Sequence, residues 1–152
     1  MRIKRFHRMM AIPFWTGLLI LSAYGIAQAS PDEFSPKHKV VIQVSTDDAT
    51  VQKIALNNAV NVQELYGMDN VQVEVVAYGP GLGLLTQKNQ QAVRVKSLAQ
   101  QNIQFSACGN TIDKITKKTG KKPILTEGVQ VVTAGVSRIM ELQEQGYSYI
   151  RP

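Results

Sequence analysis

The stretch with the clearest capacity for chemistry surrounds Cys108, the single cysteine of the 152-residue chain. The apolar run at residues 103–107 predicts a buried strand, and a helix is expected to begin near Ile112. Ligands of α/β proteins bind at the carboxyl ends of strands. A helix amino terminus adds unpaired N–H groups and a partial positive charge, which favour a thiolate over a thiol. Cys108 is therefore the candidate catalytic residue.

The three residues directly after the cysteine, Gly109, Asn110 and Thr111, are candidate substrate-binding residues. Asn and Thr side chains commonly accept hydrogen bonds from the first N–H groups of a helix. Because the junction lies at the edge of the predicted sheet, we expect Cys108 to be partly accessible to solvent. The alternative stays open, since a lone cysteine is often a small buried hydrophobic residue.

A second notable stretch is the glycine-rich segment GPGLGLL at residues 79–85. It lies between a predicted strand at 71–78 and a predicted helix at 87–101, so it also falls at the carboxyl edge of the sheet. Its spacing differs from the dinucleotide fingerprint, which needs its third glycine three residues after the second, where this chain has Leu84, and a later acidic residue. Its candidate substrate-binding residues are Gly79, Gly81 and Gly83.

The leucines of this segment, Leu82, Leu84 and Leu85, are expected to be exposed. Exposed apolar side chains in a loop indicate a lid over a site or a subunit contact. The alternative is an ordinary turn that covers the edge of the sheet.

The counts of metal-ligating residues argue against several common sites. His38 is the only histidine after the amino-terminal segment, and it precedes the first predicted strand. One histidine and one cysteine do not supply a zinc site or a Cys–His nucleophile pair. The sequence therefore predicts no metal site and no cofactor.

Residues 1–29 have the pattern of a secretory signal peptide. Four basic residues and no acidic one occupy positions 1–8, an apolar run follows, and Ala27-Gln28-Ala29 fits a small-x-small cleavage site. We expect cleavage after Ala29, a periplasmic or secreted protein, and no stable membrane anchor after cleavage. An uncleaved anchor is the alternative.

Loss of residues 1–29 removes four of the 17 basic residues and none of the 11 acidic ones, so the formal net charge falls from +6 to 13 − 11 = +2. The high sequence pI therefore reflects mainly this segment, which argues against nucleic acid as a partner. The remaining 152 − 29 = 123 residues suit one small domain. We expect a flexible lead-in at 30–37 and a single domain at 38–152.

Strand and helix patterns alternate along that domain. Strands are predicted at 39–45, 71–78, 103–107 and 147–151, and at least one of the short apolar pieces 124–126 and 129–132 should be a strand. Helices are predicted at 51–66, at 87–101, from Ile112 to Gly120, and between Thr133 and Gly146. This alternation predicts an α/β domain with a mainly parallel five-stranded sheet.

Several of these stretches resemble those of a known family. FSACGNT at 105–111 resembles the cysteine motif of the DsrE/DsrF-like family of small sulfur-handling proteins, and the end of the chain, 136–152, is similar to that of exported members. The glycine-rich segment and the asparagine-rich first helix also fit. The resemblance spans roughly residues 38–152.

The resemblance implies a three-layer α/β/α sandwich and a homo-oligomer, a trimer or hexamer. In sulfur-relay members, the cysteine that matches Cys108 carries sulfur as a persulfide, which implies a sulfur carrier or sulfurtransferase-like protein with an unknown donor or acceptor. This chain departs from those cytoplasmic members in its predicted export. A non-catalytic homo-oligomeric binding protein with a structural Cys108 and a thiol redox sensor remain as alternatives.

The signal-peptide interpretation makes one direct prediction. The protein produced in its own cell should begin at Ser30, because the signal peptidase pattern ends at Ala29. Amino-terminal sequencing of the mature product checks this. A membrane-bound product that retains Met1 would contradict it.

Overall fold

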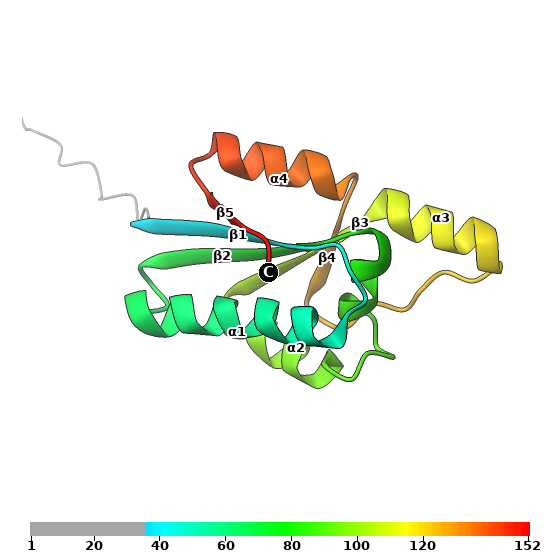
Figure 1. The fold of residues 1–152 in the computed structure, drawn as a ribbon, viewed down its shortest axis with the longest axis horizontal. Helices are drawn as coiled ribbons and strands as arrows, with labels where there is room; N and C mark the ends of the chain where they lie inside the picture. Colours follow the sequence, from blue (N-terminus) through cyan, green and yellow to red (C-terminus); the bar gives the residue numbers. More distant parts are fainter. Residues whose placement is uncertain (1–35) are drawn as a thin grey trace, which may run out of the picture. The chain divides into compact units, whose positions relative to one another are not determined.

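The computed structural model describes residues 36–152, in which strands and helices alternate (Figure 1). The predicted signal peptide and most of the lead-in lie outside the described residues. The elements in chain order are β1 (His38–Val44), α1 (Ala49–Tyr66), β2 (Val71–Ala77), the 3₁₀ helix η1 (Gly79–Leu85), α2 (Ala92–Ala99), β3 (Ile103–Cys108), α3 (Gly109–Thr119), β4 (Val129–Val132), α4 (Gly135–Glu144) and β5 (Ser148–Ile150). None of the described helices is long and apolar enough to cross a membrane.

The strands form one sheet in the order β4-β3-β2-β1-β5, and every pairing is parallel. The chain adds strands in one direction from β1 to β4 and then returns through α4 to the far side of β1. Because parallel crossovers are right-handed, this reversal places α4 on the opposite face from α1 and α2, as Figure 1 shows. The prediction of a three-layer α/β/α sandwich with a parallel five-stranded sheet is confirmed.

The larger hydrophobic core lies between the sheet and helices α1 and α2. One row of it crosses three strands in direct register, Ile42, Val75 and Phe105, and each of these residues is fully buried. Leu56 of α1 and Leu98 of α2 close over this face. Each such side chain contributes about 1.5–3 kcal/mol through burial, so this layer carries most of the stability of the fold.

The opposite face of the sheet is different in kind. Within residues 36–152, the buried members of its apolar core are Val41, Val76, Ile139 and Leu142. The buried polar residue Glu74 of β2 also lies here, where it binds Arg138 of α4. A single helix, α4, therefore covers a face that is partly polar.

The glycine-rich segment differs from its prediction. It forms the 3₁₀ helix η1, and Leu82, Leu84 and Leu85 are at most 1% exposed, within the larger core. The prediction of exposed leucines in a lid or subunit contact is wrong. The reason is the close approach of Gly81 to β1, where a Cβ atom would lie 2.2 Å from the carbonyl oxygen of Val44, so the segment packs directly on the sheet.

Three element boundaries also differ. Helix α2 begins at Ala92 and not at residue 87, because residues 87–91 form turns. Helix α3 begins at Gly109, three residues earlier than predicted, and α4 has Ala134 at its N-cap in place of Thr133. Of the two short apolar pieces, Val129–Val132 is the strand, while Leu125 makes only an isolated bridge with Thr86.

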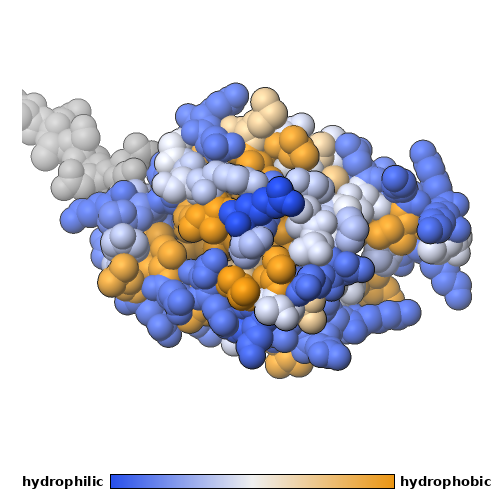
Figure 2. All heavy atoms as spheres, viewed as in Figure 1, coloured by the Kyte–Doolittle hydropathy of each residue, from blue (hydrophilic) through white to orange (hydrophobic). Residues whose placement is uncertain are grey.

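The surface that Figure 2 shows is mostly hydrophilic, with hydrophobic residues between the polar ones. Lys117 and Lys118 lie in the last turn of α3, and Gly120 ends the helix in the left-handed conformation with φ +70°. The carboxyl end of a helix has a partial negative charge, so cations in this position are stabilising. This pair of lysines therefore belongs to a helix end.

Candidate functional site

Cys108 lies at the junction of two elements, as the last residue of β3 and the N-cap of α3. Its φ and ψ of −71° and 117° continue the extended backbone of the strand up to the first residue of the helix. The residue is only 5% exposed. The expectation of partial access is wrong for this chain as it is folded here, because η1 and the first turn of α4 both close on the same edge of the sheet.

Hydrogen-bond donors from two helices converge on the Cys108 sulfur. Burial raises the pKa of the thiol, whereas the hydroxyl of Thr111 and the backbone N–H groups of Gly135, Thr111 and Asn110 lower it. The donors outweigh burial, and the pKa of Cys108 lies below its ordinary value. Hydrogen bonds to the charged form favour that form, so the site is built to hold a thiolate in a nearly closed environment.

Thr111 connects the cysteine to the glycine-rich segment. Its Oγ1 accepts a hydrogen bond of 3.0 Å from the N–H of Gly79, and its hydroxyl donates to the Cys108 sulfur. A hydroxyl that accepts on one side is oriented to donate on the other. The structure therefore brings together two stretches that the sequence analysis identified separately.

The predicted site glycines divide into two groups. Gly79, with φ +56°, and Gly109 lie at the sheet edge beside Cys108; a Cβ atom on Gly109 would come within 3.1 Å of the Val132 carbonyl oxygen. Gly81 instead permits the contact of η1 with β1, and a Cβ atom on Gly83 would meet open space. The latter two support the segment and do not lie among the groups that bind the thiol.

Two residues of the site were missed in the sequence analysis. Gly135 opens α4 and donates its N–H to Cys108. A Cβ atom on Gly135 would lie 3.1 Å from the Tyr78 side chain and 3.3 Å from the Cβ of Cys108. The signal was present, because Tyr78 ends one predicted strand and Gly135 comes shortly after another, but only the sheet order shows that those strand ends adjoin β3.

The other candidate residues of the sequence lie elsewhere. His38 opens β1 at the amino edge of the sheet, where its ring stacks on Tyr66 with 3.8 Å between the ring centroids. Among residues 36–152 there is no group of three or more His, Cys, Asp or Glu residues that could hold a metal ion.

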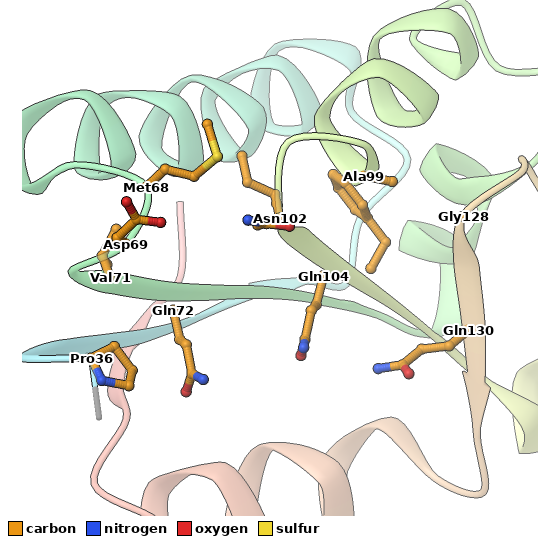
Figure 3. Close-up of a pocket in the computed structure, with 12 residues that line it drawn as sticks. Pro36, Met68, Asp69, Val71, Gln72, Ala99, Asn102, Gln104, Gly128 and Gln130 are labelled. Atoms are coloured by element: carbon orange, nitrogen blue, oxygen red, sulfur yellow. The ribbon is translucent and has the colours of Figure 1, made fainter. Parts of the chain in front are cut away.

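Two hollows in the surface differ in their relation to the site. One of about 470 Å³ runs beside β4 and the start of α4, and its lining includes Val132, the register partner of Cys108. Another of about 400 Å³ lies at the amino ends of β2, β3 and β4. Figure 3 shows that Gln72 and Gln104 point from the sheet toward the side of α4 in this second hollow. None of the predicted site residues lines it.

Comparison with known proteins agrees with the fold. Residues 38–152 match the family model of the DsrE/DsrF-like family. Among solved structures, the chain is similar to MTH1491 from Methanobacterium thermoautotrophicum, described as a protein of unknown function. The two share 32% identity with a TM-score of 0.68, over 76% of this chain and 99% of that one. No curated protein matches the sequence.

The hydroxyl of Thr111 makes a testable contribution to the thiolate. Replacing Thr111 with Val keeps the shape but removes the donor, so the pKa of Cys108 should rise by about one pH unit. The rate of alkylation of the folded protein against pH gives this midpoint. Thr111→Ser retains the hydroxyl and should leave the midpoint close to that of the unmodified protein; equal shifts in both variants would contradict the assignment.

Proposed function

Because the chain belongs to the DsrE/DsrF-like family, we propose that it is a sulfur carrier that holds sulfur as a persulfide on Cys108. The observation that supports this most is the set of groups that lower the pKa of one buried sulfur atom. They are the Thr111 hydroxyl and the N–H groups of Gly135, Thr111 and Asn110, the last of which also donates to the Thr133 carbonyl oxygen at 3.2 Å. A structural cysteine needs no donors, since a thiol packs as a small hydrophobic residue. A sulfur atom that must carry negative charge does need them.

The proposed step is attack of the Cys108 thiolate on the outer sulfur of a donor persulfide. The thiolate electron pair forms the new S–S bond, and the donor S–S bond breaks. Its electron pair leaves with the donor sulfur as a thiolate, and the proton stays on the transferred sulfur or is lost to solvent. No external oxidant is required, because the transferred sulfur keeps its oxidation level. The same four donors would then hold the persulfide on Cys108.

The 5% exposure of Cys108 limits the donor. A small-molecule persulfide, or a short flexible segment of a partner, could reach the sulfur after a modest movement of the surrounding groups. Tyr78 is only partly buried and packs beside Gly135 and Cys108, so the Tyr78 ring is the group expected to move.

The same low exposure supports a second candidate function, a non-catalytic binding protein in which Cys108 is a packing residue. The two proposals differ in the state of the thiol. A packing residue has a pKa raised by desolvation and reacts only after unfolding, whereas the carrier reacts in the folded state with a midpoint below that of a free cysteine.

Incubation with a small persulfide donor tests the carrier proposal. Mass spectrometry of the folded protein should show the addition of one sulfur atom on the peptide that contains Cys108. Cys108→Ser should fold, because the side chains are similar in size, and should gain no sulfur. If alkylation requires denaturant and no persulfide forms, the carrier proposal is contradicted and the binding-protein proposal is favoured.

Assembly and export complete the proposal. We propose a homo-oligomer, following the family resemblance, in a periplasmic or secreted location, following residues 1–29. The buried η1 leucines are not available for a subunit contact. Val136 and Met140 are better candidates, since they lie one turn apart on α4 and are 55% and 57% exposed.

The contact on α4 can be tested by charge. Met140→Asp should weaken assembly, because burying an unpaired carboxylate is costly. The control is Leu65→Asp on α1, where the side chain is 75% exposed. Light scattering at micromolar concentration measures the mass. A single-subunit mass for the unmodified protein would contradict the oligomer, and loss of assembly only in the Leu65 variant would place the contact on α1.

A further inference from the structure

The sheet face beneath α4 contains one fully buried carboxylate. Glu74 of β2 is 0% exposed, and Arg138 of α4 binds it with two hydrogen bonds, Nε to Oε1 at 2.9 Å and Nη2 to Oε2 at 2.7 Å. Ser106 of β3 donates its hydroxyl to Oε1 at 2.5 Å, and Gln130 of β4 donates to the Ser106 oxygen at 2.9 Å. Three neighbouring strands and one helix are thus joined by a single polar network.

Such a network is a costly way to stabilise a protein. The loss of hydration of a buried ion pair can exceed the gain from its attraction, and hydrophobic residues of similar volume often replace it without loss. What a two-point contact between a guanidinium and a carboxylate does supply is a defined geometry. The geometry that this pair defines is the position of α4 over β2 and β3.

The network lies close to Cys108 along two elements, strand β3 and helix α4. Ser106 precedes Cys108 by two residues on β3, so both side chains project from the same face of the strand. Arg138 follows Gly135 by three residues, about one helical turn. The pair therefore joins the strand that ends at the cysteine to the helix whose first N–H group binds its sulfur.

Helix α4 has few other attachments near its start. Its N-cap residue Ala134 makes no side-chain capping bond, and its buried apolar side chains, Ile139 and Leu142, come after the first turn. Just before the helix, the Thr133 carbonyl oxygen accepts a hydrogen bond of 3.2 Å from the N–H of Asn110. At Gly135 the contact with Tyr78 and Cys108 leaves no room for a side chain. Arg138 is thus the side chain that holds the first turn of α4 against the sheet.

From this arrangement we propose that Glu74 and Arg138 are positioning residues for Cys108. Their ion pair fixes the first turn of α4, so that the N–H of Gly135 points at the sulfur. The proposal rests on the proposed function only in taking Cys108 as the reacting group. It predicts that the thiolate loses a donor when the pair is altered, although neither side chain binds the sulfur.

The charges around this region allow position to be separated from direct attraction. Besides the pair itself, the titratable groups on this side are Glu141, whose carboxylate lies 3.5 Å from Arg138, and the phenols of Tyr78 and Tyr147. Farther along the sheet, Lys39 lies with its Nζ 5.9 Å from the centre of the Tyr147 ring, and the Tyr149 hydroxyl donates to Gln43. A phenol is neutral near neutral pH, and burial, with a contribution from Glu74, raises the pKa of Tyr147 further. Arg138→Lys retains every charge and removes only the planar two-point contact.

The test is the pH dependence of Cys108 alkylation in Arg138→Lys and Glu74→Gln. The midpoint should rise by about 0.5–1 pH unit in both variants, as for the loss or weakening of one hydrogen bond to a charged group. The amide resonance of Gly135 should shift in an NMR spectrum of the same samples. Circular dichroism confirms folding, and either variant alone suffices if the other is unfolded.

Two controls separate positioning from general loss of stability. Leu56→Ala opens a cavity in the core on the other face of the sheet, and Lys96→Gln removes the exposed ion pair of Lys96 with Glu127. Both should leave the midpoint and the Gly135 resonance unchanged. An unchanged midpoint in Arg138→Lys and Glu74→Gln, or an equal shift in Leu56→Ala, would overturn the proposal. These measurements need no persulfide, so they stand apart from the test of sulfur transfer.

Discussion

The parallel direction of all strands is the constraint on which the rest of this structure depends. Parallel strands end at the same edge of the sheet, so β2, β3 and β4 deliver Tyr78, Cys108 and the turn before Gly135 to one place. Each of these strand ends leads directly into a helix or 3₁₀ helix. The edge therefore contains the first N–H groups of helices, such as that of Gly135, which can donate to a buried anion.

The properties of Cys108 follow from a balance between two opposing effects at that edge. Desolvation alone would make the thiol inert and neutral, and it is the largest single influence on its pKa. The hydroxyl of Thr111 and three N–H groups together exceed it. A cysteine that is closed to solvent yet disposed to ionise suits the proposed carrier role, in which the sulfur would be protected between reactions.

The two faces of the sheet contribute differently: one mainly stabilises the fold, and the other defines the position of the helix that covers it. The face beneath α1 and α2 is almost wholly apolar and contains the large side chains of the core, including the leucines of η1. The face beneath α4 has a small apolar cluster and a polar network around Glu74. Hydrophobic contacts tolerate small displacements, whereas the paired hydrogen bonds of a carboxylate and a guanidinium do not. The polar face adjoins the side of Cys108 that α4 covers.

The sequence by itself determined the class of fold and pointed to a candidate site. Alternating apolar strands and amphipathic helices predicted the parallel α/β sheet, and the strand-to-helix junction identified Cys108 with Gly109, Asn110 and Thr111, because these signals are local. Only the tertiary structure decided what surrounds the sulfur. Gly135 lies 27 residues after Cys108 in the chain, and the network of Glu74 and Arg138 spans 64. It also decided that the η1 leucines are buried, since their environment depends on the contact of Gly81 with β1, which no local pattern of residues encodes.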